Sequence, residues 1–165
     1  MQSSNSDETL ATPVEFCEYI SGYISNEDIS AQRVITEMQK LCQERFVQMF
    51  GKTIQMKRLS CVFGDDGIPE GYYAALTVYP WKTSELVRNL RQRAEEWSGD
   101  TYDYCLVQLY PDGNAPIAWH ADNECLNSGV LSLSFGATRK FRLRRRGENA
   151  ATSSNGSYAP EISCT

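Results

Sequence analysis

The residues best suited to chemistry are His120, the only histidine of the chain, and Asp122, two positions later. On an extended segment, residues i and i+2 face the same way, so the imidazole and the carboxylate can reach one metal ion. They would supply two ligands of a 2-His-1-carboxylate triad, which leaves positions on Fe(II) open for a cosubstrate and O2. A His-x-Asp pair by itself is more often an ordinary hydrogen-bonded pair, so its surroundings decide the interpretation.

The residues around His120 extend this signal into an ordered string of motifs. Residues 106–124 read LVQLYPDGNAPIAWHADNE, and residues 131–143 read LSLSFGATRKFRL. These segments closely resemble the AlkB family of Fe(II)- and 2-oxoglutarate-dependent dioxygenases, and most of all its nucleic-acid-repair members. The resemblance covers residues 50–146, with further matching positions at Arg58-Leu59, Phe63-Gly64-Asp65, Tyr72-Tyr73 and Pro80-Trp81.

The resemblance implies Fe(II) as cofactor and 2-oxoglutarate as cosubstrate, with His120 and Asp122 as the first two iron ligands. Tyr110 matches the tyrosine that hydrogen-bonds 2-oxoglutarate, and a core tyrosine is the alternative interpretation. Gln108 lies on the same strand face as Tyr110, because successive side chains alternate, and this fits a shared pocket. It stands where the family usually has Asn, so its side chain is one methylene longer.

Four further positions match residues that line the substrate site in the family: Arg58, Tyr73, Asn123 and Arg139. Tyr73 falls where an aromatic ring stacks on a flipped base, which replaces part of the stacking lost from the duplex; a structural aromatic is the alternative. Asn123 stands where an Asp usually reads the base edge, and an amide can donate as well as accept. The implied reaction is oxidative demethylation of N-alkylated bases in DNA or RNA, with release of formaldehyde.

The charge distribution bears on the partner. The net charge is -5, and residues 1–30 hold six acidic side chains with no Lys or Arg, so the rest of the chain carries +1. An acidic chain argues against a protein that coats nucleic acid through bulk electrostatics. A basic strip is nevertheless present: Arg139, Lys140, Arg142, Arg144, Arg145 and Arg146. Within it, Lys140 and Arg144 to Arg146 form either phosphate contacts or a solvated face.

Two helices and several short strands must position these groups. Capping residues and apolar spacing predict one helix from Asn26 or Ser30 to Cys42, and another from Thr83 or Ser84 with a buried stripe of Leu86, Val87, Leu90, Ala94 and Trp97. Alternation and turn residues predict strands at residues 52–63, 71–78, 104–110, 117–120, 130–135 and 141–143. This order indicates an α+β fold, a helix-buttressed double-stranded β-helix (jelly roll) that is incomplete in this chain.

We expect an acidic flexible arm at residues 1–13, the N-terminal part of an AlkB-like dioxygenase domain at residues 14–146, and a loop and chain end at residues 147–165. The sequence shows neither a signal peptide nor an apolar run long enough to span a membrane, which predicts an intracellular protein, nuclear or cytoplasmic, without a membrane partner. Six scattered cysteines without a CxxC pair favour reduced, buried thiols over disulfides or a zinc site.

A second histidine is absent from the sequence, and the resemblance places the distal iron histidine and the arginine that clamps 2-oxoglutarate beyond Thr165. Three interpretations stay open. The chain is an incomplete part of a working demethylase, a non-catalytic relative that binds nucleic acid or protein through the basic strip and an open sheet edge, or a half-domain completed by a protein partner. For the isolated chain we expect no 2-oxoglutarate turnover above background.

Overall fold

The computed structural model describes residues 17–49, 51–65, 76–122, 129–141, 143 and 161–162. The helices are α1 (Ala31–Leu41), the short 3-10 helix η1 (Trp81–Thr83) and α2 (Glu85–Ser98). The strands are β1 (Gln43–Met49), β2 (Lys52–Gly64), β3 (Val78–Tyr79), β4 (Tyr104–Leu109), β5 (Arg139–Lys140) and β6 (Glu161–Ile162). The expected arm at residues 1–13 lies outside the described residues. Among the helices that are described, none is both long enough and apolar enough to cross a membrane.

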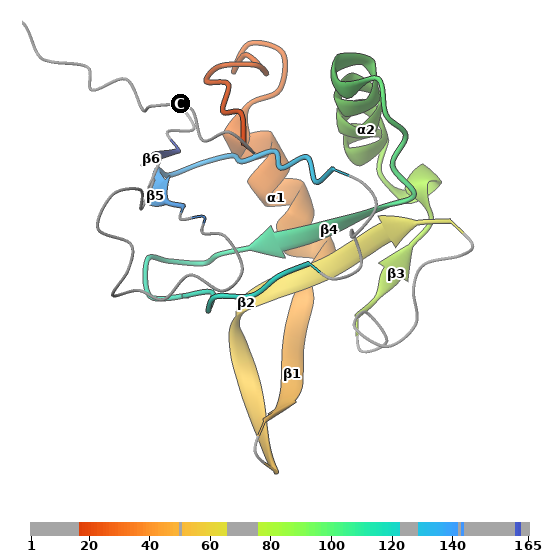
Figure 1. Ribbon diagram of the computed structural model, residues 1–165. Coiled ribbons are helices and arrows are strands. Elements are labelled where there is room, and N and C mark those ends of the chain that lie inside the picture. Colours follow the sequence, from red (N-terminus) through yellow and green to blue (C-terminus); the bar gives the residue numbers. More distant parts are fainter. Residues whose placement is uncertain are drawn as a thin grey trace, which may run out of the picture.

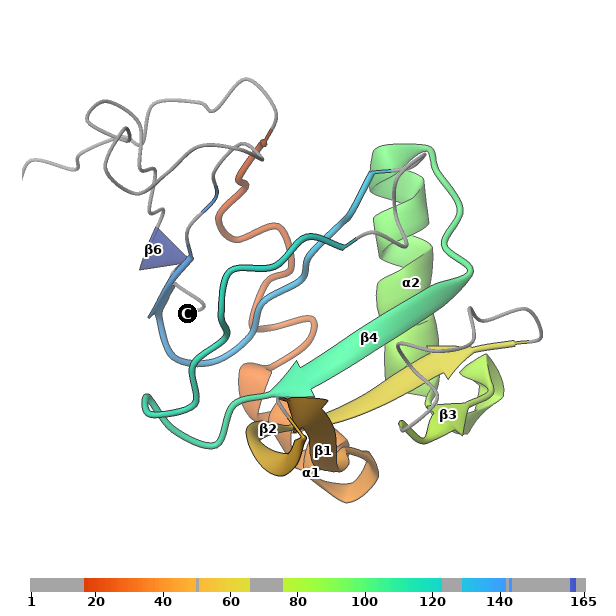
Figure 2. The same cartoon turned by 60° about the horizontal axis from the view of Figure 1, so that its bottom comes forward.

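The long strand β2 organises a four-stranded sheet (Figure 1 and Figure 2). Its first part pairs with β1 in an antiparallel hairpin, and its last part pairs with β4 on one side and with the parallel strand β3 on the other. The hairpin register changes between Glu44 and Phe46, so that Arg45 of β1 opposes three residues of β2, Met56 to Arg58. Beyond this bulge the hairpin projects from the body of the molecule (Figure 1).

Both helices form where the sequence predicts them, because a serine caps each one. Ser30 Oγ accepts a hydrogen bond from the Arg33 amide at the start of α1, and Ser84 Oγ accepts one from the Val87 amide at the start of α2. The second helix ends at Gly99, whose φ of 74° is a left-handed conformation that costs glycine little. The two helices lie on the same side of the sheet (Figure 1).

The alternation of β2 and β4 divides the sheet into two faces. The face toward the helices carries Cys61 and Phe63, which pack with the helical residues in one buried cluster. The partly buried side chains of Cys105, Val107 and Leu109 join this cluster, as the alternation predicts. The opposite face has a smaller apolar cluster of Val62 and Leu76 with Tyr104 and Leu106. Next to that smaller cluster, the same face presents the polar residues of β2 and β4.

Trp97 was predicted in the buried stripe of the second helix, and this is wrong. Its side chain is 45% exposed, while Leu86, Val87, Leu90 and Ala94 are buried as expected. Trp97 instead packs edge-to-face on Tyr23, with 6.1 Å between the ring centroids. In this aromatic pair, Tyr23 from the segment before α1 partly covers the indole ring at the surface. The ring can therefore be partly shielded from solvent without being buried in the core.

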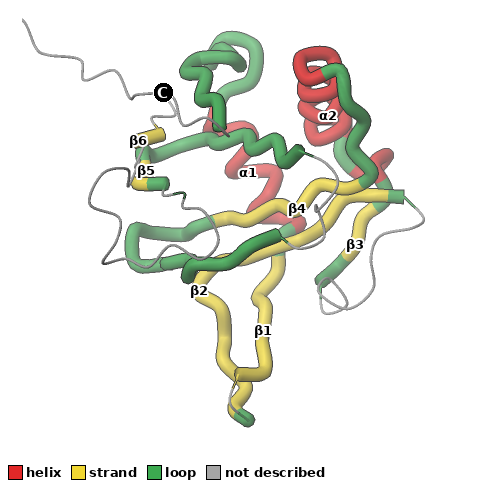
Figure 3. Tube along the Cα trace, viewed as in Figure 1, coloured by secondary structure: helices red, strands yellow, loops and turns green. Residues whose placement is uncertain are grey.

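The strands expected at 117–120 and 130–135 are also wrong: both segments run without ladder hydrogen bonds (Figure 3). A strand needs a neighbour to pair with, and none of the described segments lies in register with them. The side-chain alternation of the second segment is real, since Leu133 and Phe135 pack on the main core. In place of the strand expected at 141–143, strand β5 begins two residues earlier in the sequence, and it pairs with β6. Strand β1 was not predicted.

Candidate active site

The predicted metal pair lies on the segment that follows β4. His120 Nε2 is 3.5 Å from Asp122 Oδ1, and the two side chains are 45% and 50% exposed. The other ring nitrogen, Nδ1, is 2.8 Å from the carbonyl oxygen of Ala118. A carbonyl can only accept, so Nδ1 carries a proton.

His120 Nε2 and Asp122 Oδ1 face each other across 3.5 Å. Such an arrangement needs a proton or a metal cation between the atoms. The Ala118 carbonyl plays the part that a second-shell acceptor plays at metal sites, because it fixes the ring orientation and the tautomer. The pair thus fits two positions of a metal site, as its spacing predicts. Within the described ranges, no group of three His, Cys, Asp or Glu side chains completes it.

A second group of predicted residues gathers at the end of β4. Tyr110 donates its hydroxyl hydrogen to Gln108 Oε1 at 2.8 Å, so the two residues share one face as expected. The ladder sets Leu109 opposite Leu59, which brings Arg58 beside Tyr110. Arg58 is only 6% exposed. The bond from Tyr110 occupies the amide oxygen of Gln108, and the NH2 group is the end that can donate to a carboxylate.

Arg139 reaches this group from a distant part of the sequence. Its Cζ lies 4.4 Å from the centroid of the Tyr110 ring, and its Nη2 donates to the carbonyl oxygen of Ala115 at 3.0 Å. Nη1 is buried and finds no acceptor among the described residues. A buried guanidinium N–H is costly to leave unpaired, so the position favours an anionic ligand.

Burial and charge act in opposite directions on Tyr110. Burial raises the pKa of the phenol, and the positive charges of Arg58 and Arg139 lower the pKa by a smaller amount. The phenol therefore stays protonated at neutral pH and can donate a hydrogen bond. Two arginines and a neutral phenol on one face form a surface that is suited to a carboxylate.

Comparison with known proteins decides what this arrangement belongs to. The family model described as the 2OG-Fe(II) oxygenase superfamily matches residues 16–158, which is most of the chain. The chain belongs to the 2OG-Fe(II) oxygenase superfamily. The resemblance to the AlkB family of this superfamily, expected from the motifs around His120, is confirmed by the similarity of the chain to several AlkB-family proteins.

DNA oxidative demethylase ALKBH2 of Bos taurus is 33% identical over 103 residues, which cover 61% of this chain and 37% of that protein. The protein of the same name from Mus musculus is 34% identical over 103 residues, 61% of this chain and 43% of that protein. Alpha-ketoglutarate-dependent dioxygenase alkB homolog 3 of Homo sapiens is 34% identical over 100 residues, 57% of this chain and 33% of that protein. The matched region thus spans less than half the length of each of these relatives.

Membership of the 2OG-Fe(II) oxygenase superfamily confirms Fe(II) as cofactor and 2-oxoglutarate as cosubstrate. It also implies the jelly-roll fold expected from the sequence, while the described strands here form an open, mixed sheet. The residues present fit the metal as an imidazole and a carboxylate that face each other. No second imidazole is available from the sequence, which holds one histidine.

The structure brings the predicted residues of this oxygenase together as two groups. One is His120 with Asp122, and the other is Arg58, Gln108, Tyr110 and Arg139. In the part of the chain that is described, no hydrogen bond or ion pair joins the two groups. Tyr73 and Asn123 lie outside the described residues, as do Arg144, Arg145 and Arg146. The assigned roles of all these residues stay predictions.

Sequence reasoning missed Ser60. It is 2% exposed, it faces Gln108 across the ladder, and it lies on the same face of β2 as Arg58. The signal was present, because Ser60 is two positions from Arg58 within a predicted strand and so must share its face. A buried hydroxyl beside Gln108 adds a polar group to the floor of the site.

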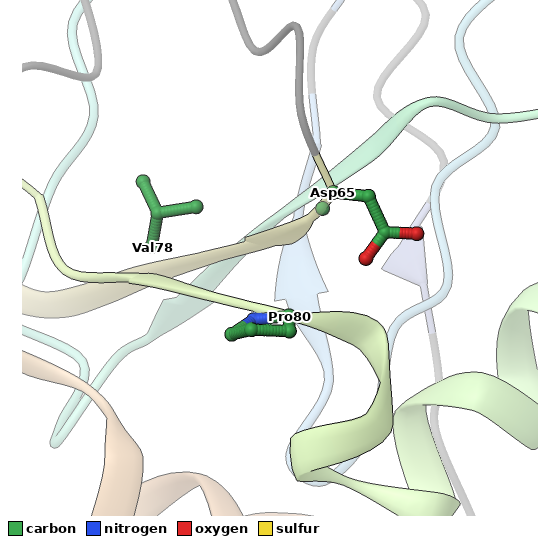
Figure 4. Close-up of a pocket in the computed structure, with 4 residues that line it drawn as sticks. Asp65, Val78 and Pro80 are labelled. Carbon is green, nitrogen blue, oxygen red and sulfur yellow. The ribbon is translucent and has the colours of Figure 1, made fainter.

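A shallow pocket of about 340 Å³ lies at the far end of β2 (Figure 4). Its lining is Gly64, Asp65, Val78 and Pro80. Among the described residues of this lining, Asp65 is the only titratable side chain, and none is a predicted catalytic or cosubstrate residue. The described lining of this pocket therefore shares no residue with the two groups of the candidate active site.

Proposed function

We propose that this chain acts in the oxidative demethylation of N-alkylated bases in nucleic acid, with Fe(II) as cofactor and 2-oxoglutarate as cosubstrate. The observation that carries the proposal is the convergence of His120 Nε2 and Asp122 Oδ1, with the tautomer fixed by Ala118. Several relatives are named DNA oxidative demethylases, which favours alkylated DNA over RNA as the first substrate to test.

Each group of residues has a defined part in this proposal. His120 and Asp122 hold Fe(II), which when bound supplies the activation of O2 and the oxidation of the N-methyl carbon. The amide NH2 of Gln108 donates to a carboxylate of 2-oxoglutarate, and the Tyr110 hydroxyl changes its acceptor from Gln108 Oε1 to the same carboxylate. Arg58 and Arg139 add positive charge beside that carboxylate, and Nη1 of Arg139 gains an acceptor that none of the described residues offers.

A three-ligand iron site needs a second imidazole, and the 165 residues contain only His120. We propose that the missing ligand comes from polypeptide outside this sequence, in the extreme case from a protein partner. Large apolar side chains of the segments expected as strands, or next to them, are exposed, which suits a surface that another segment covers: Ile117, Val130 and Phe141. Neighbouring strands would also supply the ladder partners that residues 117–120 and 130–135 lack.

Metal binding tests the proposal most directly. Co(II) can stand in for Fe(II), and its absorption spectrum reports an imidazole–carboxylate site. We expect His120→Ala and Asp122→Ala each to weaken Co(II) binding by about 10-fold or more. Asp103→Ala, which removes an exposed carboxylate before β4, serves as the matched control. Equal Co(II) affinity in all three variants would contradict the assignment of the metal ligands.

Demethylation is tested with single- and double-stranded DNA that carries an N-methylated base, in the presence of Fe(II) and 2-oxoglutarate. Loss of the methyl group, measured by mass spectrometry of the oligonucleotide, supports the catalytic function. The 165 residues are tested together with the polypeptide that supplies the second imidazole, because we expect them to be inactive alone. Binding of the strand without loss of the methyl group under these conditions would favour the second candidate, a non-catalytic nucleic-acid-binding relative. RNA of the same sequence, tested in parallel, distinguishes the two substrate classes.

A further inference from the structure

Two cysteine thiols meet in the core under the helices. Cys42 and Cys61 are 6% and 0% exposed, and their Sγ atoms are 3.3 Å apart. Both cysteines are free thiols, and neither belongs to the candidate active site. Cys42 is the residue that ends α1, where its backbone N–H donates to the carbonyl oxygen of Met38.

The backbone already holds the two cysteines in a geometry that a disulfide can span. Gln43 pairs with Ser60 in the antiparallel ladder, so Cys42 and Cys61 are the next facing positions. Facing residues on antiparallel strands have Cα atoms about 4.5–5.5 Å apart, which lies within the range found for disulfides. A bond between the two sulfurs therefore needs side-chain rotation and no shift of the strand register.

The two thiols differ in reactivity. The two sulfurs are within hydrogen-bond distance, and either thiol can be the donor. When Cys61 donates, this bond lowers the pKa of Cys42, although burial opposes the shift. The same bond, together with burial, raises the pKa of Cys61. Cys42 is also the more exposed of the two, so an oxidant meets the more reactive sulfur first. Cys105, a third thiol on this face of the sheet, has its pKa raised by burial to about 11.

We propose that Cys42 and Cys61 form a reversible dithiol–disulfide pair that responds to peroxide. The sulfur of Cys42 attacks the O–O bond of hydrogen peroxide, which gives a sulfenic acid at Cys42 and one molecule of water. The thiol of Cys61 then displaces the hydroxyl of the sulfenic acid, which forms the S–S bond and releases a second molecule of water. Two thiols lose two electrons, and hydrogen peroxide gains them.

The disulfide would tie the end of α1 to the middle of β2. Cys61 lies opposite Val107 of β4, one position from the Ser60–Gln108 pair. Oxidation therefore cross-links the helix layer to the strand that supports the cosubstrate residues. The disulfide would close the loop from Cys42 to Cys61. Such a covalent link stabilises the folded chain mainly because it reduces the conformational freedom of the unfolded chain.

The test treats the folded protein with hydrogen peroxide in the presence of a metal chelator, so that iron chemistry does not contribute. We expect the intact mass to fall by two hydrogens and peptide mapping to join the peptides that contain Cys42 and Cys61. The thermal midpoint should rise by about 5 °C or more and return after addition of a thiol reductant.

Three cysteine variants test which two sulfurs form the disulfide. Cys42→Ser and Cys61→Ala should each abolish the joined peptide, while Cys105→Ser, the matched control on the same face, should retain it. If Cys42→Ser or Cys61→Ala does not fold, differential alkylation of the wild-type protein tests the proposal instead. After oxidation, both Cys42 and Cys61 should be protected from alkylation. Alkylation of Cys42 or Cys61 at the level of the untreated protein, or a peptide joined through Cys105, would overturn the proposal.

Discussion

The guanidinium of Arg139 lies over the ring of Tyr110, with 4.4 Å between Cζ and the ring centroid. This contact joins the segment after the 130–135 run to the end of β4, where the cosubstrate residues were predicted. The planar group covers one face of the ring and leaves the hydroxyl to donate to Gln108. Arg139, predicted as a substrate residue, therefore lies against the predicted cosubstrate residue.

The hydroxyl of Tyr110 is the group with the most specific predicted role. Tyr110→Phe keeps the ring under Arg139 and removes only the hydrogen bond to Gln108 or to a bound carboxylate. Loss of one such bond costs about 1–1.5 kcal/mol, so we expect 2-oxoglutarate affinity to fall by about 10-fold. Calorimetric titration of the Co(II)-loaded protein measures this change. Tyr102→Phe, on the loop before β4, is the control, and equal affinity in the two variants would remove Tyr110 from the site.

The charge of Arg139 should be visible in the titration of the same phenol. Because the guanidinium lowers the pKa of Tyr110, Arg139→Gln should raise the pKa and shift deprotonation to higher pH. The signal of Tyr110 in NMR of protein with 13C-labelled tyrosine, assigned with Tyr110→Phe, follows this shift. Arg88→Gln on the exposed side of α2 should leave the Tyr110 titration unchanged. A pKa that falls in Arg139→Gln would contradict the contact.

Glu95 gives the fold a dependence on acid. Its carboxylate accepts hydrogen bonds from the Tyr102 amide at 3.1 Å and from Arg91 Nε at 2.8 Å, and the backbone bond is the main cause of its lowered pKa. A lowered folded-state pKa adds stability above the unfolded pKa, about 4.3 for Glu, and this stability is lost as pH falls through the folded value.

Urea denaturation from about pH 6 to pH 3 tests this dependence on Glu95. Glu95→Gln should be less stable than the wild type at pH 6, and the difference should shrink as the pH falls. Glu96→Gln changes the neighbouring exposed carboxylate and should leave the slope of stability against pH almost as it is. Parallel curves for wild type and Glu95→Gln would assign the acid dependence to other groups.

Ser84 ties the two helices together at the start of α2. Its hydroxyl accepts from the Val87 amide at 3.1 Å and donates to Glu37 of α1, and the residue is 2% exposed. We expect Ser84→Ala to lower the free energy of unfolding by about 1–2 kcal/mol, because the cap and the partner of Glu37 are lost together. Thr83→Ala, one residue earlier and exposed, should cost less than about 0.5 kcal/mol in the same denaturation experiment. Similar losses in both variants would mean that Ser84 is not the cap.

The sequence contained enough local information for the helices and for the two main strands. Ser30 and Ser84 mark the helix starts by a capping mechanism that acts within one turn, and the alternation from Tyr104 to Leu109 assigns each side chain of β4 to its face. Strand β1 was not predicted from its residues, QERFVQM. They mix charged and apolar side chains on an exposed hairpin, and the apolar residues do not alternate with a clear period of two.

The candidate site was predictable as a set of residues and not as a geometry. The His120–Asp122 pair follows from spacing of i and i+2, which is a local rule. The stacking of Arg139 on Tyr110 depends on how two distant segments pack, and no local pattern encodes that. The same limit explains Trp97: helical spacing assigned it to the buried side, but Tyr23, far away in the sequence, offers it a partner at the surface.

The bulge in the β1–β2 hairpin has a consequence for how this chain can vary. Residues beyond the bulge pair only with each other, whereas Leu59 and the residues after it are held by β4. The projecting end can therefore gain or lose facing pairs of residues while the register of Arg58 and Ser60 beside Tyr110 and Gln108 stays fixed. Natural variation in the length of the hairpin would change how far the hairpin projects, while the positions of the residues at its base would not change.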